Sequence, residues 1–344
     1  MKKNFLLLFI CILFLVPCLA KEKNPLFKIT LNDKQGYIDK TGKIVIEPRF
    51  EAAANFSEGL ARVEINDKWG FINRKGKIVI KPIFAWAWDF HEGLANVQVG
   101  DLAFSGKRNW GFIDGKGRMI IKPQFDELHG VAETSQGFVE GLAIIEIDFW
   151  KGFINKVGKM VVEPQFSSAY PFTEGLACVT KELNDKSGYI DKKGRWKIYP
   201  KFDDASLFSE KLAPVSLNGK CGFITRKGTF VLHPFNSNGD CPTIWGHFNG
   251  GLSRWKIGEK FGYINKNGEV TIKPEFNITD HFSEGMAEVR INGKLGFIDT
   301  TGKIVVEPKF EFVDSFENGL ARVVIDGKIG YIDKIGNYVW KPTK

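Results

Sequence analysis

The sequence predicts an all-β fold made of nine tandem copies of one small antiparallel unit. The copies align on a glycine that is followed directly by an aromatic residue, with a second glycine six residues later and a proline twelve residues later. Both offsets hold in all nine copies, which indicates a repeat array. The aligned glycines are Gly36, Gly70, Gly111, Gly152, Gly188, Gly222, Gly262, Gly296 and Gly330.

The copy over residues 287–310 illustrates the predicted unit. Apolar and charged residues alternate over 287–291, which is typical of a half-buried strand. Asn292-Gly293 then predicts a type I′ hairpin turn into a second strand over 294–298. Asp299 to Gly302 predicts a type I turn, and Pro308 is expected to end the third strand at residue 307. Each copy is therefore predicted to be a three-stranded antiparallel meander.

Glycine inside the second strand predicts a close approach, and we expect an aromatic ring of the neighbouring copy to pack over Gly296. A connector typified by 56–61 carries a glutamate in nearly every copy. Such repetition favours an architectural role, in which the carboxylate accepts backbone amides at the tight Glu-Gly corner, over catalysis. The aspartates that begin the second turn are expected to cap that turn rather than bind metal: Asp39, Asp114, Asp191, Asp299 and Asp333.

A single unit is too small to bury its own apolar face, so neighbouring copies are expected to stack. We expect an open β-superhelix or solenoid, because a propeller blade normally has four strands and this unit offers three. The terminal copies are also complete, over 27–31 and 338–340, which leaves no strand to be shared between the ends. The alternative is a closed propeller-like ring. In an open array, loss of the last copy should cost less stability than loss of an interior copy.

Residues 1–20 resemble a secretory signal peptide. A basic start is followed by an uncharged apolar run over 5–16 and by small residues before Lys21. We expect cleavage after Ala20, which leaves a secreted or periplasmic repeat array over 21–344. The alternative is a lipoprotein anchored at Cys18. No segment of the mature chain is long and apolar enough to span a membrane.

Composition excludes several classes of function. The formal charge is +8, and basic and acidic residues are interspersed in every copy, so no basic stripe predicts nucleic-acid binding. The scattered histidines lack metal-site spacing, and we expect neither metal nor cofactor. The mature cysteines Cys178, Cys221 and Cys241 are an odd and sparse set, which argues against a disulfide framework. Cys178 and Cys221 are expected to be small buried hydrophobes.

The stretches Lys68-Trp69-Gly70-Phe71-Ile72-Asn73 and Phe56-Ser57-Glu58-Gly59-Leu60-Ala61 resemble the WG repeat family, also called KWG repeats. The resemblance covers residues 27–344. Tryptophan precedes the anchor glycine only at Trp69 and Trp110, which departs from the family name. The resemblance implies a bacterial, often exported, non-catalytic β-repeat protein, and it brings no catalytic residues with it.

The irregular copies are the predicted binding region, because insertions in repeat proteins form loops that often bind ligands. Longer spacings place insertions over 100–109, 126–137 and 236–247, and unshared aromatics lie near a connector. The alternative is that these aromatics fill gaps in the core. The candidate binding residues are Trp86, Trp88, Phe104, Trp110, His129, Trp245 and His247.

Two classes of function remain open. The first is an exported, non-catalytic scaffold that binds an envelope or extracellular protein or a polysaccharide, and that we expect to be a monomer. The second is an extracytoplasmic glycan hydrolase with a site in the inserted loops. Glycan hydrolysis would require a pair of carboxylates about 5–10 Å apart in one cleft. We expect the binding protein, because repeat surfaces bind far more often than they catalyse.

Overall fold

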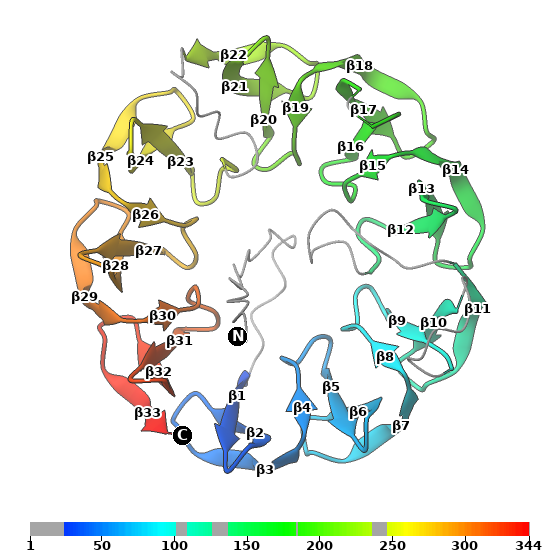
Figure 1. Ribbon diagram of the computed structural model, residues 1–344, viewed down its shortest axis with the longest axis vertical. Helices are drawn as coiled ribbons and strands as arrows, with labels where there is room; N and C mark the ends of the chain where they lie inside the picture. The colour runs from blue at the N-terminus through cyan, green and yellow to red at the C-terminus, as the bar shows by residue number, and fades with distance from the viewer. Residues whose placement is uncertain (1–23, 101–108, 126–136, 184, 236–245, 344) are drawn as a thin grey trace, which may run out of the picture.

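The computed structural model describes residues 24–100, 109–125, 137–183, 185–235 and 246–343. Within these residues the chain forms nine small antiparallel sheets, which follow one another around a closed ring (Figure 1). The expected open superhelix is therefore wrong, and the alternative, a closed nine-bladed propeller, is confirmed. We number the blades 1 to 9 in chain order.

Each blade contains the three predicted strands. The first strands are β1 (Leu26–Leu31), β5 (Leu60–Ile65), β9 (Leu94–Gln98), β12 (Leu142–Ile147), β16 (Leu176–Thr180), β20 (Leu212–Leu217), β23 (Leu252–Ile257), β27 (Met286–Ile291) and β31 (Leu320–Ile325). The second strands are β2 (Lys34–Asp39), β6 (Lys68–Asn73), β10 (Trp110–Asp114), β13 (Trp150–Asn155), β17 (Ser187–Asp191), β21 (Lys220–Thr225), β24 (Lys260–Asn265), β28 (Lys294–Asp299) and β32 (Lys328–Asp333). The third strands are β3 (Ile44–Phe50), β7 (Ile78–Phe84), β11 (Met119–Phe125), β14 (Met160–Phe166), β18 (Trp196–Phe202), β22 (Phe230–Phe235), β25 (Val270–Phe276), β29 (Ile304–Phe310) and β33 (Tyr338–Thr343).

Six blades also have a fourth strand, of two residues, that the sequence analysis missed. These short strands are β4 (Ala52–Ala53), β8 (Trp86–Ala87), β15 (Ser168–Ala169), β19 (Asp204–Ala205), β26 (Ile278–Thr279) and β30 (Phe312–Val313). Each follows the third strand of one blade in sequence but pairs with the first strand of the next blade, as in the order β4-β5-β6-β7. The connector residues therefore belong to the next blade, which supplies the four strands of a propeller blade.

The third strands form the outer wall of the ring (Figure 1). Proline does not end them, contrary to expectation. In blade 8 the pairs Ile298↔Ile304 and Leu295↔Phe310 flank an irregularity in the register, and the strand runs on through Pro308. Proline is tolerated there because the third strand is an edge strand, on which a missing amide donor breaks no ladder.

The anchor glycine packs differently from the prediction. A Cβ atom at Gly296 would lie 2.4 Å from the backbone oxygen of Val306 and 2.7 Å from the nitrogen of Pro308, both in the third strand of its own blade. No aromatic ring of a neighbouring blade occupies that space. The glycine is therefore required by the bulge within the blade, where the third strand crosses close to the second.

Neighbouring blades pack through shared apolar clusters. The cluster between blades 1 and 2 joins Tyr37 and Phe50 of the first to Ala61 and Val63 of the second. The second glycine of seven copies fits against an isoleucine or valine side chain of the preceding blade, as Gly302 does against Ile272, whose nearest atom is 3.0 Å from the position of a Cβ. The expected stacking of copies on their neighbours is thus confirmed.

The ring closes by side-chain packing between blades 9 and 1. Phe27 and Ile29 of β1 share a cluster with Leu320 and Tyr331 of blade 9. The hydroxyl of Tyr331 donates a hydrogen bond of 2.7 Å to the backbone oxygen of Lys28. No strand is exchanged, since β1 pairs within the first sheet and β33 within the last. Completeness of the terminal copies therefore did not exclude a ring.

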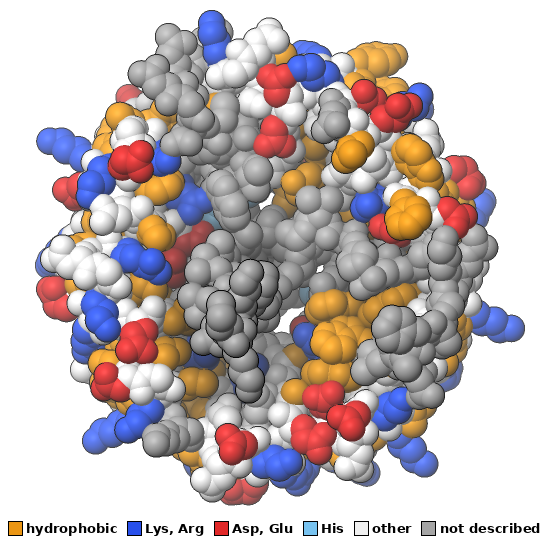
Figure 2. Space-filling view, viewed as in Figure 1, with side chains coloured by type: hydrophobic (Ala, Val, Ile, Leu, Met, Phe, Trp, Pro, Cys, Tyr) orange, Lys and Arg blue, Asp and Glu red, His pale blue; other side chains and the backbone are white. Residues whose placement is uncertain are grey.

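The described part of the chain contains no helix long and apolar enough to cross a membrane. On the face shown in Figure 2, Lys and Arg side chains alternate with Asp and Glu side chains around the rim. This distribution agrees with the interspersed charges of the sequence.

Candidate functional site

The repeated glutamates of the connectors form hydrogen bonds between blades. Glu92 of blade 3 accepts the backbone N–H of Gly141 in blade 4 at 2.9 Å and pairs with the ammonium of Lys156 at 3.0 Å. The predicted architectural role of accepting amides is confirmed, but the donor belongs to the next copy. The same bridge recurs at Glu58, Glu140, Glu174, Glu210 and Glu284.

This glutamate bridge is absent between blades 9 and 1, which meet where the ring closes. Asn318 stands at the glutamate position, and the residue of blade 1 that corresponds to the donor glycine is Pro25, which has no backbone N–H.

The turn aspartates also behave as predicted. Asp39 Oδ1 accepts the backbone N–H of Thr41 at 2.8 Å and that of Lys43 at 3.2 Å, and no metal-binding cluster of His, Cys, Asp and Glu occurs among the residues with described positions.

Three of the candidate binding residues gather near blades 2 to 4. Trp110 is buried, and Trp86 and Trp88 pack half-buried against its cluster. The guanidinium of Arg62 lies over both Trp69 and Trp88, at 5.1 and 4.9 Å from the ring centres. These tryptophans contribute to the packing between blades, so that only part of the Trp86 and Trp88 side chains is exposed to a ligand.

The other candidates do not join them. His247 lies between blades 6 and 7, where its Nε2 is 3.2 Å from the hydroxyl of Ser206 and its side chain is buried. Phe104, His129 and Trp245 lie outside the described residues. Cys178 is buried and free, as expected. Cys221 is buried as expected, but it is disulfide-bonded, which corrects its interpretation as a simple buried hydrophobe.

Ionisable side chains are largely buried from blade 6 to blade 8. Burial lowers the pKa of both His247 and His281 to about 3, so both imidazoles are neutral at neutral pH. Burial, together with the charges of Asp280 and Asp314, raises the pKa of Glu288 to about 8. A carboxyl group with such a pKa can donate a hydrogen bond at pH 7. It lies on β27, the first strand of blade 8.

A cavity lies where the ring closes, and residues of blades 9, 1 and 2 line it. It has a volume of about 470 Å³, and we call it the seam cavity. Its walls include the aromatic residues Phe27, Phe56, Trp69 and Tyr331. Blade 1 has no short strand among the described residues, and the edge of β1 that faces away from β2 lies beside the cavity.

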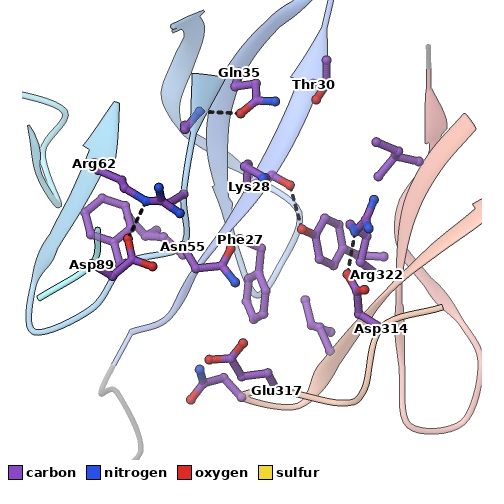
Figure 3. A pocket seen from close by; sticks show the side chains of 18 of the residues that line it. Phe27, Lys28, Thr30, Gln35, Asn55, Arg62, Asp89, Asp314, Glu317 and Arg322 are labelled. Carbon is purple, nitrogen blue, oxygen red and sulfur yellow. Dashed lines mark hydrogen bonds and ion pairs between the residues drawn. The ribbon is translucent and has the colours of Figure 1, made fainter. Parts of the chain in front are cut away.

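Three cationic side chains face the seam cavity, one from each blade (Figure 3). Arg62 Nε is 2.9 Å from Asp89 Oδ1, and Arg322 Nε is 2.6 Å from Asp314 Oδ2. Lys28 lies between these two arginines, and burial followed by the charges of Arg322 and Arg62 lowers its pKa. Among the residues with described positions, no carboxylate forms an ion pair with the Lys28 ammonium. The lining therefore balances three cations against the three acids Asp89, Asp314 and Glu317, and Lys28 is the cation for which no described acid is an ion-pair partner.

These three cations were not among the residues predicted from the sequence. They occupy the third position of the first strand, where blade 7 also carries a basic residue, Arg254, and the other copies carry Asn96, Ile144, Cys178, Pro214 and Glu288. A basic residue at such a position was the available signal. Its meaning depended on ring closure, because only closure brings residues 28 and 322 into one cavity.

Comparison with known proteins identifies the repeat. The model of a WG containing repeat matches seven segments that together cover more than half of the chain: residues 36–69, 69–102, 110–148, 152–184, 188–221, 261–294 and 296–328. The chain belongs to the WG containing repeat family. The resemblance inferred from the sequence is thus confirmed.

Solved structures support the propeller. A crystal structure of the eukaryotic initiation factor aligns with a TM-score of 0.63 at 11% sequence identity, covering 93% of this chain and 96% of that chain. Apo AztD from Citrobacter koseri gives a TM-score of 0.41 at 13% identity, covering 93% of each chain, and streptogramin B lyase gives 0.38 at 17% identity, covering 73% of this chain and 92% of that chain. Only the first likeness is close enough to argue from, and it concerns the fold alone. No curated protein matches the sequence.

Proposed function

We propose that this WG-repeat propeller is an exported, non-catalytic scaffold that binds another protein at the cell envelope as a monomer. The observation that carries the proposal is the seam cavity, which combines an unpaired strand edge, aromatic walls and a cation without an acidic partner among the described residues. Aromatic side chains and arginine are the residue types that contribute most at protein interfaces.

Export is supported by two observations. The first is the pattern of residues 1–20, with its basic start, apolar run and small residues before Lys21. The second is the disulfide at Cys221, because disulfides persist in oxidising compartments outside the cytoplasm. N-terminal sequencing of the protein from a periplasmic or secreted fraction should begin at Lys21. A cytoplasmic protein that begins at Met1 would contradict export, and lipid labelling that requires Cys18 would support the lipoprotein.

Binding is tested by affinity capture from envelope extracts with the mature protein as bait, followed by binding measurements with each purified partner. Two folded variants locate the surface. Lys28→Glu reverses the charge of the seam cavity, and a variant trimmed of residues 101–107 and 237–246 removes most of two predicted binding loops. We expect the first to lose the partner and the second to retain it. Equal binding by the parent and Lys28→Glu would contradict binding at the seam, and release of glycan fragments by the purified parent would contradict the non-catalytic role.

A further inference from the structure

We propose that the edge of β1 accepts an extended acidic segment of a partner protein as an added strand, with a carboxylate of that segment against the Lys28 ammonium. This inference rests on the proposed function and deepens it by naming the site and the chemistry of the partner. Addition of a strand to an exposed sheet edge is a recurrent way of binding peptides, in which main-chain hydrogen bonds supply affinity and side-chain contacts supply specificity.

The main-chain pattern that an added strand would complete is repeated in the other blades. In blade 2 the N–H of Glu51 donates to the oxygen of Glu64 at 3.2 Å, and the N–H of Ala54 donates to the oxygen of Arg62 at 3.0 Å. The second bond recurs in blades 3, 5, 6, 8 and 9, at distances from 2.9 to 3.4 Å. In blade 1 the oxygens at the two positions belong to Thr30 and Lys28.

Of these two backbone oxygens, one accepts a hydrogen bond from a side chain instead of from a neighbouring strand. The backbone oxygen of Lys28 accepts a hydrogen bond from the Tyr331 hydroxyl. The ring centres of Tyr331 and Phe27 are 5.5 Å apart. No described strand pairs with the edge of β1 that faces away from β2, and both Thr30 and Lys28 line the seam cavity (Figure 3). An unpaired edge of this kind is a template for another chain.

The spacing of the repeat explains why the mature chain would lack its own strand here. Ala52 and Ala53 of β4 precede the first residue of β5, Leu60, by eight and seven residues. The residues at the same spacing before Leu26 are Cys18 and Leu19, which fall within the proposed signal peptide. Cleavage after Ala20 would therefore remove the residues that correspond to the short strand of blade 1.

The charge of the segment follows from the equivalent contact in blade 9. Arg322 occupies the same strand position as Lys28, and its guanidinium pairs with Asp314, which directly follows the short strand β30. A segment that pairs with β1 in the way that β30 pairs with β31 would place its own acidic residue beside Lys28. The surrounding guanidinium groups of Arg62 and Arg322 are already paired, so the added carboxylate would neutralise the unmatched cation rather than compete for a partner.

The test uses a synthetic peptide with the sequence of residues 309–316, Lys-Phe-Glu-Phe-Val-Asp-Ser-Phe, which contains β30 and its acid. Binding to the mature protein that begins at Lys21 is measured by fluorescence anisotropy. We expect saturable binding, and about tenfold weaker binding when the aspartate of the peptide is replaced by asparagine, since hydrogen bonds to charged groups exceed neutral ones. Hydrogen exchange should slow within residues 26–31 on addition of the peptide.

Two protein variants make the result specific. Lys28→Gln should bind both peptides equally, because the charge that distinguishes them is gone. Lys303→Gln, which changes an exposed lysine of blade 8, should preserve the tenfold preference. Equal binding of a scrambled peptide, or the absence of protection over 26–31, would overturn the inference.

The outcome is separable from that of the proposed function. If envelope partners bind the parent protein but neither the peptide nor Lys28→Gln affects them, the scaffold function stands and the strand edge is not its site. If the peptide binds but no envelope partner does, the edge is competent and the proposed function fails. A mature protein that retains Cys18 and Leu19 and excludes the peptide would show that the chain fills its own edge, which would also overturn the inference.

Discussion

At the scale of single residues, the repeat is defined by positions where the backbone leaves no room for a side chain. The hairpin turns illustrate a second constraint, since Asn292 and Gly293 both have positive φ angles, of 49° and 80°. Asparagine and glycine tolerate that conformation at low cost, which is why the type I′ turn could be predicted there. The anchor glycines are fixed by a crowded backbone instead, and their φ angles are not positive.

Replacement of Gly296 by alanine should destabilise the protein by about 1–3 kcal/mol, the usual cost of overpacking. The new Cβ would lie 2.4 Å from the Val306 oxygen, which is backbone and cannot rotate away. Gly115→Ala is the control, because its Cβ would meet only Leu60 Cδ1 at an ordinary 3.7 Å. Urea unfolding of both variants measures the difference, and an unchanged midpoint for Gly296→Ala would refute the role of the bulge.

The buried Glu288 should make stability depend on pH. Its pKa is raised from 4.5 to about 8, so the folded state retains a proton that the unfolded state releases across this window. The free energy of unfolding that Glu288 contributes is therefore largest below the unfolded pKa and falls as the pH rises through about 8.

Urea unfolding of the parent and of Glu288→Gln at roughly pH 5 and pH 9 isolates this effect, since the two proteins share every other titrating group. We expect the parent to lose stability relative to the variant between the two pH values. A constant difference would show that Glu288 ionises normally in the folded protein.

At the scale of elements, adjacent blades are connected by polar bridges as well as by apolar packing. The carboxylate of Glu284 accepts the Gly319 N–H at 2.9 Å and lies 3.2 Å from the Lys334 ammonium. Because the glutamate itself has a positive φ of 51°, its side chain projects from the turn toward the next blade. The interblade direction of this bond was not visible in the sequence, although its repetition correctly indicated an architectural role.

Glu284→Ala should destabilise the protein by about 1–2 kcal/mol, since it leaves the Gly319 amide without its acceptor, whereas Lys334 keeps its hydrogen bond to the backbone oxygen of residue 284. Glu307→Ala is a matched control, because this exposed glutamate lies on the outer strand of the same blade. Differential scanning calorimetry should show a lower melting temperature for the first variant alone. Equal melting temperatures would indicate that solvent replaces the bridge without cost.

At the scale of the whole molecule, ring closure makes every blade an interior blade. Loss of the last copy would therefore expose the cluster shared by Phe27 and Tyr331, so the smaller cost expected for the end copy of an open array does not follow for a ring. Closure between blades 9 and 1 contains the seam cavity, and it lacks the glutamate bridge, as does the interface between blades 7 and 8, where Gly250 stands at the glutamate position. The properties of this one interface arise from the ends of the chain meeting.

Tyr331→Phe should lower stability by about 1 kcal/mol, the typical net worth of one hydrogen bond, because the Lys28 oxygen loses its donor. The exposed Tyr199, on the outer strand of blade 5, provides the control Tyr199→Phe. Chemical denaturation compares the two variants with the parent. If both behave as the parent does, water replaces the hydroxyl and the closing hydrogen bond contributes nothing.

The sequence by itself determined the unit. Nine copies, three strands in each, the type I′ and type I turns and the capping role of Asp39 follow from local spacing and turn chemistry, which act within a few residues. The same locality explains the errors. The bulge at Gly296 and the continuation of the strand through Pro308 depend on how two strands cross, and the two-residue strand is too short to leave a periodic pattern.

The tertiary structure alone decided that the array closes. Closure depends on a small rotation from each unit to the next, summed over nine units, and no residue pattern records that rotation. The candidate site follows from it, since Lys28 and Tyr331 meet across the seam only because the ring returns to its start. A basic residue at position 28 was visible in the sequence, but its partners, its burial and the unpaired edge beside it are properties of the closed ring.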